Sequence, residues 1–126
     1  MENLIQIFKK QKNIAVVGAT DKEEKYGFKV FKKLKKIGYT VFPVNPNVDF
    51  IENDEVYNSI SKVNDRIDAV SMIVNPQVGK NIIKEINRKN IDLVWFQPGA
   101  YNEELIDYCR ENNIKVIYER CVLADL

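Results

Sequence analysis

The sequence feature that most constrains the fold is the run Ile14–Thr20, which reads IAVVGAT. It opens with four apolar residues, and a near-continuous apolar run is typical of a parallel strand buried on both faces. Gly18 ends the strand, and glycine permits backbone angles and close approaches that a side chain would block. An amphipathic helix pattern follows. The succession predicts the start of a βαβ unit in which a ligand phosphate can meet backbone N–H groups.

The remainder of the chain alternates between strand and helix patterns. The expected elements are a helix over 2–12, strand 14–18, helix 27–37, strand 39–44, strand 68–74, a helix opening at Asn75-Pro76, strand 92–97, a helix capped by Asn102, and strand 115–119. Polar turns and a short helical piece near Val56–Ile60 fill residues 47–66.

This alternation predicts an α/β fold, with a Rossmann-like, doubly wound, five-stranded parallel sheet of order 3-2-1-4-5. We expect a single domain over residues 1–126 with an N-terminal helix. Right-handed crossovers place a ligand crevice outside the carboxyl ends of the strands, near the switch point between strands one and four.

Composition excludes several classes of function. A net charge of +1 argues against a nucleic-acid partner, and no apolar run reaches the roughly 18 residues of a membrane span. The N-terminus lacks a signal-peptide cleavage site, and two cysteines do not suggest a disulfide framework, so we expect a reduced, cytoplasmic protein. The absence of histidine excludes Ser-His-Asp and Cys-His catalytic pairs and histidine-containing zinc sites.

Small, turn-forming and amide residues stand at the carboxyl ends of all five expected strands. They are Gly18-Ala19-Thr20, Asn45-Pro46, Asn75-Pro76, Gln97-Pro98-Gly99 and Arg120-Cys121. Turn chemistry explains any one of these sets. It explains less well five sets on one edge of a parallel sheet, and that edge is therefore the predicted site.

The nucleotide signals at this edge do not favour NAD. The residues after Gly18 lack the later glycines of a G-x-G-x-x-G fingerprint, and the second strand ends in Asn45-Pro46 where an NAD site has Asp or Glu. An NADP site would have an arginine there, and the Gly-Lys-Ser/Thr of a P-loop is missing too.

Five segments together resemble a known family. They are AVVGAT at 15–20, GYTVFPVNP at 38–46, VYNSI at 56–60, VWFQPGAYNEE at 94–104 and ERC at 119–121. The chain resembles the small stand-alone CoA-binding domain proteins, which are similar to the nucleotide-binding domain of the succinyl-CoA synthetase α subunit. The resemblance implies a Rossmann-like fold that binds coenzyme A, or an acyl-CoA, through its ADP part.

The resemblance also implies roles for individual residues. Gly18, Ala19 and Thr20 would cradle the pyrophosphate, Asn45 and Pro46 would line the adenosine side, and Asn75 and Pro76 would border the pocket. The chain departs from the family at Thr20, often serine there, and at Glu119 and Val122, where Asp and Pro often flank the Arg-Cys pair.

Further candidates come from the chemistry of CoA, whose 3′-phosphate favours nearby cations. Lys22 and Lys25 in the first loop are candidates for that contact, against the alternative that they are only solvated. Tyr26 and Gly27 open the next helix and are expected to offer N–H groups to a phosphate.

Two residues near the ends of the last two strands, Gln97 and Cys121, have open roles. Gln97 either hydrogen-bonds a ligand or satisfies the backbone of the turn that contains Gly99. Cys121, next to Arg120, is either a half-buried structural thiol or a reactive one that forms a mixed disulfide with the CoA thiol.

No set of residues supplies a nucleophile with its base. The succinyl-CoA synthetase mechanism uses a phosphorylated histidine, which this chain lacks. We therefore expect a non-catalytic carrier, sensor or regulatory module with a small-molecule nucleotide as its partner, neither nucleic acid nor membrane. Two alternatives remain: an NAD(H)-binding redox sensor or oxidoreductase, and a thiol-active protein that uses Cys121.

Overall fold

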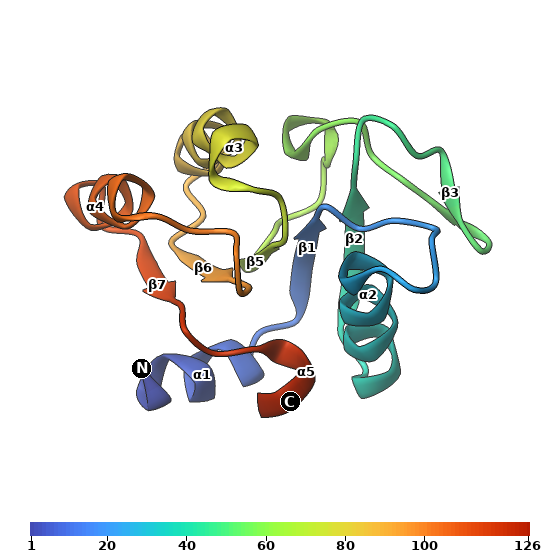
Figure 1. Ribbon diagram of the computed structural model, residues 1–126, viewed down its shortest axis with the longest axis horizontal. Coiled ribbons are helices and arrows are strands. Elements are labelled where there is room, and N and C mark those ends of the chain that lie inside the picture. The colour runs from blue at the N-terminus through green and yellow to red at the C-terminus, as the bar shows by residue number, and fades with distance from the viewer.

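The structure is a computed structural model that describes all 126 residues. A five-stranded parallel sheet of order β2-β1-β5-β6-β7 forms its centre (Figure 1). The elements in chain order are α1 (Glu2–Lys9), β1 (Asn13–Val17), α2 (Tyr26–Ile37), β2 (Thr40–Val44), β3 (Phe50–Ile51), β4 (Asp54–Glu55), the 3₁₀ helix η1 (Ile60–Lys62), β5 (Ala69–Met72), α3 (Pro76–Arg88), β6 (Leu93–Phe96), α4 (Glu103–Glu111), β7 (Lys115–Ile117) and α5 (Val122–Asp125).

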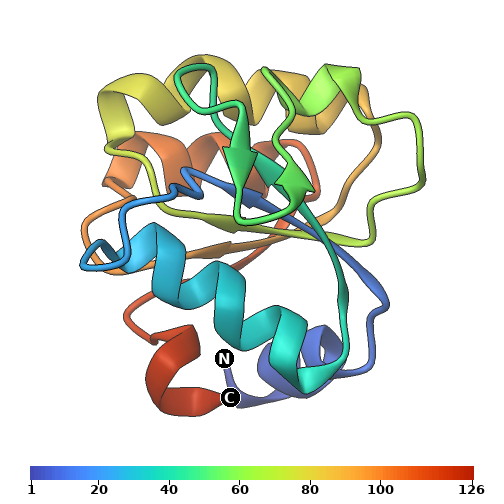
Figure 2. The ribbon, with the colours of Figure 1, turned by 90° about the vertical axis from the view of Figure 1, so that its right-hand side faces the viewer.

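Helices cover both faces of the sheet. Figure 2 shows α3 and α4 on one side of the strands and α1, α2 and α5 on the other. Successive residues of β1 point to opposite faces, so Ala15 and Val17 join the core under α3 and α4, while Ile14 and Val16 join the core over α1 and α2. This two-sided burial is the reason why β1 is apolar from Ile14 to Val17, and it confirms the predicted doubly wound α/β class.

The strand order needs one correction. The prediction numbered residues 68–74 as the third strand, which would lie outside β2, but β5 pairs with β1 instead. Outside β2, where the prediction places the third strand, the structure has only a single parallel bridge between Val44 and Tyr57. When that bridge is counted as a strand, the order reads 3-2-1-4-5 with β7 as a sixth strand, and the switch point lies between β1 and β5.

Pro43 explains why no full strand follows on that side. The Pro43 carbonyl accepts a hydrogen bond from the Tyr57 N–H at 2.9 Å, so the outer edge of β2 faces the Tyr57 segment. Proline has no N–H to donate, and prolines in sheets are confined to edge strands. The proline therefore leaves only one isolated bridge beyond β2.

The segment between β2 and β5 differs from its prediction. It contains the antiparallel pair β3–β4, and its helical piece lies at Ile60–Lys62 instead of Val56–Ile60. The N-terminal helix is confirmed but ends at Lys9, short of residue 12. The short helix α5, which the sequence patterns did not predict, follows Cys121. No helix is both long and apolar enough to cross a membrane.

Candidate functional site

The loop after β1 turns at Gly18, in the middle of the rim formed by the carboxyl ends of the strands. Gly18 has a φ of +97°, which side-chain-bearing residues rarely adopt. A Cβ at this position would lie 3.2 Å from Val74 Cγ1 and from the carbonyl carbon of Ile73. Glycine therefore lets the chain leave the sheet directly against the end of β5.

The second close approach is between this loop and the start of α2. A Cβ on Gly27 would lie 2.2 Å from the carbonyl oxygen of Gly18, a distance that no side chain can occupy. Lys25, the N-cap residue of α2, is extended and its side chain makes no capping hydrogen bond. The N–H groups of the first turn have no partner inside a helix, so they point from α2 towards the rim without a side-chain acceptor.

Two hollows flank Gly18. The α3 cleft has a volume of about 440 Å³ and is lined by Val17, Gly18, Val44, Asn45, Pro46, Asn47, Asn58, Ser59, Ile60, Val74, Asn75, Val78, Ile82 and Glu85. The α2 hollow has a volume of about 360 Å³ and is lined by Gly18, Thr20, Lys22, Lys25, Tyr26, Gly27 and Ile73. Since both share Gly18, a single extended ligand can lie across the glycine and occupy both.

Asn45 ties the two loops of the rim together. Its Nδ2 donates to the carbonyl of Ala19 at 2.8 Å, and its Oδ1 accepts the N–H of Asn47 at 2.9 Å. The asparagine therefore fixes the glycine loop after β1 to the turn after β2. Across the cleft, the Oδ1 of Asn75 accepts the N–H of Val78 at 3.0 Å and caps α3.

Charge is distributed unequally between the two hollows. Lys22 and Lys25 lie in the α2 hollow, and Glu85 is the sole charged residue that lines the α3 cleft. The α3 cleft otherwise offers four asparagines, one serine and apolar side chains. The arrangement suits an anion on the α2 side of Gly18 and a neutral, partly apolar group on the α3 side.

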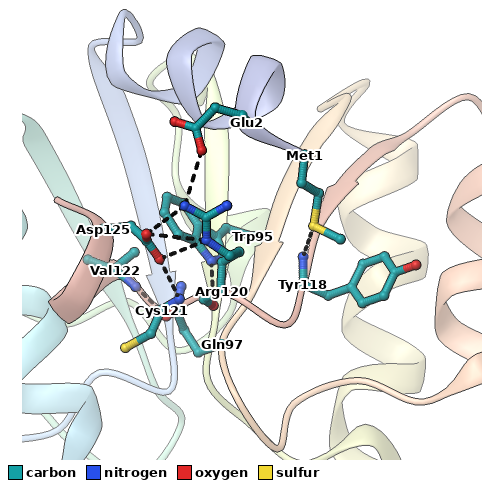
Figure 3. Close-up of polar contacts among 9 residues, drawn as sticks. All are labelled: Met1, Glu2, Trp95, Gln97, Tyr118, Arg120, Cys121, Val122 and Asp125. Atoms are coloured by element: carbon teal, nitrogen blue, oxygen red, sulfur yellow. Dashed lines mark hydrogen bonds and ion pairs between the residues drawn. The ribbon is translucent and has the colours of Figure 1, made fainter.

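Gln97 lies behind the rim, fully buried, where it joins three elements. Its Oε1 accepts the Tyr26 hydroxyl at 3.2 Å and the Val122 N–H at 3.0 Å, and its Nε2 donates to Ser71 Oγ at 3.2 Å. Figure 3 shows the Gln97 side chain directed at Val122, where α5 begins. These contacts satisfy the amide within the protein and fix the first residue of α2.

The C-terminal segment is fastened beside Gln97. Arg120 pairs with Asp125 at 2.7 Å, and the Trp95 indole donates to the Arg120 carbonyl at 3.0 Å (Figure 3). The Cys121 thiol contacts the Tyr26 hydroxyl. Burial, followed by the hydrogen bond to Cys121, raises the pKa of Tyr26 above its ordinary value near 10, so its hydroxyl remains a neutral donor.

The structure brings eight of the sequence-predicted candidates to the hollows. They are Gly18, Thr20, Lys25, Tyr26, Gly27, Asn45, Pro46 and Asn75, and Lys22 lies with them. The other candidates line neither hollow: Ala19, Pro76, Gln97, Gly99 and Cys121. Ala19 and Gln97 are buried, and Cys121 is half-buried behind Tyr26.

The sequence prediction omitted one wall of the α3 cleft. Asn58, Ser59 and Ile60 form part of it, and they belong to the VYNSI segment that carries the family resemblance. Val78, Ile82 and Glu85 continue the line of Asn75 along α3 at helical spacing. Helix periodicity places Val78 on the apolar face, but the structure leaves 49% of its surface exposed at the cleft.

Comparison with known proteins agrees with this geometry. Residues 12–126 match a protein family described as "CoA binding domain". The chain belongs to this family. The stand-alone CoA-binding domain family that the sequence resembles is thereby confirmed.

The relatives of this chain include short and long proteins. The uncharacterized protein YneT of Bacillus subtilis is 27% identical over 93% of this chain and 87% of its own length. An ADP-forming acetate–CoA ligase of Methanocaldococcus jannaschii is 30% identical over 86% of this chain, which spans 15% of that ligase.

Solved structures share the whole fold. A hypothetical protein from Pyrococcus horikoshii superposes with a TM-score of 0.92 at 31% identity, over 98% of this chain and 87% of that one. A conserved hypothetical protein from Pyrococcus furiosus superposes with a TM-score of 0.87 at 34% identity, over 92% of this chain and 100% of that one. The CoA-binding domain fold therefore extends over nearly the entire chain.

Proposed function

We propose that this protein binds coenzyme A or an acyl-CoA across Gly18, as a non-catalytic carrier, sensor or regulatory module. The observation that carries the proposal is the pair of hollows on either side of Gly18, one with lysines beside an uncapped helix and one with amide and apolar walls. Membership of the CoA-binding domain family supports CoA as the ligand.

The pyrophosphate belongs in the α2 hollow in this proposal. A helix N-terminus combines unpartnered N–H groups with a partial positive charge, and it binds phosphates for both reasons. Lys22 and Lys25 line the same hollow and add charge-assisted contacts. Gly27 brings the first turn of α2 against Gly18, so a phosphate there meets backbone with no intervening side chain.

The adenosine belongs in the α3 cleft. Val78, Ile82 and Ile60 give apolar surface for the flat base, while asparagine amides and the Ser59 hydroxyl supply hydrogen bonds for its edges and the ribose. The line from Asn75 to Glu85 runs about 15 Å along α3 at 1.5 Å per residue. That length is sufficient for a nucleoside lying along the helix.

Isothermal titration with CoA, acetyl-CoA, NADH, NADPH and ATP tests the proposal. We expect CoA or acetyl-CoA to bind tightest, because Asn45-Pro46 replaces the acidic residue that holds the ribose of NAD. In a thermal melt, a ligand at 100 times its Kd should add about 2.7 kcal/mol of stability. Binding of NADH without binding of CoA would contradict the proposal and favour the oxidoreductase alternative.

A matched pair of variants tests the placement of the pyrophosphate. Lys22→Gln/Lys25→Gln removes both charges of the α2 hollow and should weaken CoA binding by about tenfold or more. Lys36→Gln removes an exposed charge at the other end of α2 and should leave CoA binding unchanged. Equal affinity of all three proteins would place the pyrophosphate elsewhere.

A further inference from the structure

No lysine or arginine lines the α3 cleft, and its rim beside the expected ribose carries amides. In nucleotide-binding sheets of this kind, the residue that ends the second strand meets the ribose hydroxyls. Here those residues are Asn45, Pro46 and Asn47, and all three line the α3 cleft. The side-chain amide of Asn45 is already engaged by Ala19 and by the N–H of Asn47.

The charges of the site lie elsewhere. Lys22 and Lys25, which the sequence offers as contacts for the 3′-phosphate, line the α2 hollow on the other side of Gly18 together with the first turn of α2, so we assign them to the pyrophosphate instead. Glu85, the one charged residue of the α3 cleft, is half-buried, pairs with no basic group and repels anions. The positive charge of the site is therefore concentrated where the pyrophosphate is proposed to bind.

We propose that this site accepts adenine nucleotides without selecting for a 3′-phosphate on the ribose, so that 3′-dephospho-CoA binds as well as CoA itself. The inference rests on the proposed function and narrows its ligand class to the part that the two compounds share. That part is the adenosine, the pyrophosphate and the pantetheine arm.

The physical reason is the absence of a counter-charge for a second phosphate group. A phosphate held by a lysine or arginine gains charge-assisted hydrogen bonds, about twice as strong as neutral ones. Beside Asn47, which is exposed, a 3′-phosphate keeps its water and meets only a neutral amide. The 3′-phosphate then contributes little to the difference in affinity between the two ligands.

Titration of the wild-type protein with CoA and with 3′-dephospho-CoA tests the inference. We expect the two dissociation constants to agree within about threefold, the range of an exposed charge interaction. Asn47→Lys supplies the missing cation. It should lower the dissociation constant of CoA by about tenfold and change that of 3′-dephospho-CoA by less than about twofold. Asn53→Lys, in the turn between β3 and β4, adds the same charge outside the cleft and should change neither.

The lysines of the α2 hollow give an independent readout. Lys22→Gln/Lys25→Gln should weaken both ligands by the same factor, because the pyrophosphate is common to both. Wild-type protein that binds CoA more than about tenfold tighter than 3′-dephospho-CoA would overturn the inference and leave the proposed function standing. A double variant that binds CoA more weakly but binds 3′-dephospho-CoA as the wild type does would also overturn the inference and leave the proposed function standing. Failure of both ligands to bind would overturn the proposed function and this inference with it.

Discussion

The N-termini of α2 and α3 lie on the same rim, yet they are built differently. Asn75 caps α3 through Val78, and Pro76 occupies its first position. Lys25 stands at the equivalent position of α2 and makes no capping hydrogen bond. The asparagine side chain accepts a hydrogen bond from an N–H group of the first turn, and proline has no N–H group that needs a partner, so this helix end needs no acceptor from outside.

The two helix starts therefore have different roles on the rim. The end of α3 is complete without a ligand and serves as a wall of the α3 cleft. The end of α2 leaves its N–H groups for an acceptor from outside, and the close approach of Gly27 to the Gly18 carbonyl oxygen sets those groups beside the glycine loop. Substitutions that close the start of α2 or open the start of α3 test this difference.

The largest effect is expected for Gly27→Ala. Its Cβ would lie 2.2 Å from the Gly18 carbonyl oxygen, so α2 must move away from the loop. We expect a loss of about 3 kcal/mol of stability in urea unfolding, at the upper end for overpacking, together with loss of CoA binding in titration.

Gly79→Ala is the matched control in α3. A Cβ there meets Leu105 Cδ1 at 3.6 Å and Val74 Cγ2 at 3.8 Å, which are ordinary contacts. Replacing a glycine inside a helix by alanine should add roughly 0.5–1 kcal/mol of stability. If both alanine variants behaved alike, the close approach at Gly27 would not be what distinguishes the two helices.

Asn75→Ala tests the capped N-terminus of α3. Removing an N-cap asparagine costs about 1 kcal/mol, and the same loss is expected for Asn102→Ala, since Asn102 caps α4 through Leu105 at 2.9 Å. Urea unfolding measures both losses. Asn102 lines neither hollow, so CoA binding by Asn102→Ala should match the wild type. An unchanged stability in both variants would show that these caps do not complete their helices.

Lys25→Ser tests the uncapped N-terminus of α2 by adding a capping side chain. Serine is a good N-cap, so the free protein should gain about 0.5–1 kcal/mol. Its hydroxyl then competes with the ligand for the first-turn N–H groups, and CoA should bind more weakly than to Lys25→Gln, which loses the charge without adding a cap. Equal titration curves for the two variants would mean that CoA does not use these N–H groups.

The smallest effect concerns Tyr26, the first residue of α2. Burial and the hydrogen bond to Cys121 raise the pKa of Tyr26, whereas an unfolded tyrosine ionises near pH 10. The contribution of the neutral Tyr26 hydroxyl to the free energy of unfolding is therefore complete below pH 10. It is lost as the pH rises beyond 10, because the unfolded tyrosine then ionises before the folded one. Unfolding free energies measured above pH 10 should fall less steeply for Tyr26→Phe than for the wild type. Parallel curves would show that the buried hydroxyl does not contribute.

Much of this architecture could be predicted from local patterns. The apolar run Ile14–Val17 identified a strand buried on both faces, and Asn75 and Asn102 identified two helix starts that the structure confirms. The edge position of β2 was also accessible, because Pro43 cannot donate to a further strand. A strand pattern does not show which strand it pairs with, so the pairing of β5 with β1 could not be predicted in the same way.

Other features depend on contacts that local patterns do not encode. The two-residue strands β3 and β4 are too short for periodicity to detect. The sequence predicts that Gln97 faces a ligand or the next turn, but its side-chain partners are Tyr26, Ser71 and Val122, which are 25 or more residues away along the chain. The wall of the α3 cleft around Asn58 likewise forms only when the Tyr57 segment lies beside β2.

The most direct test of the account follows the backbone amides during a CoA titration by ¹H–¹⁵N NMR. We expect large downfield proton shifts for Gly27 and Phe28, whose N–H groups would donate to the pyrophosphate. The N–H of Val78, already bonded to Asn75, should move less. Saturable CoA binding with Gly27 and Phe28 unmoved would contradict the claim that α2 is left open for the ligand.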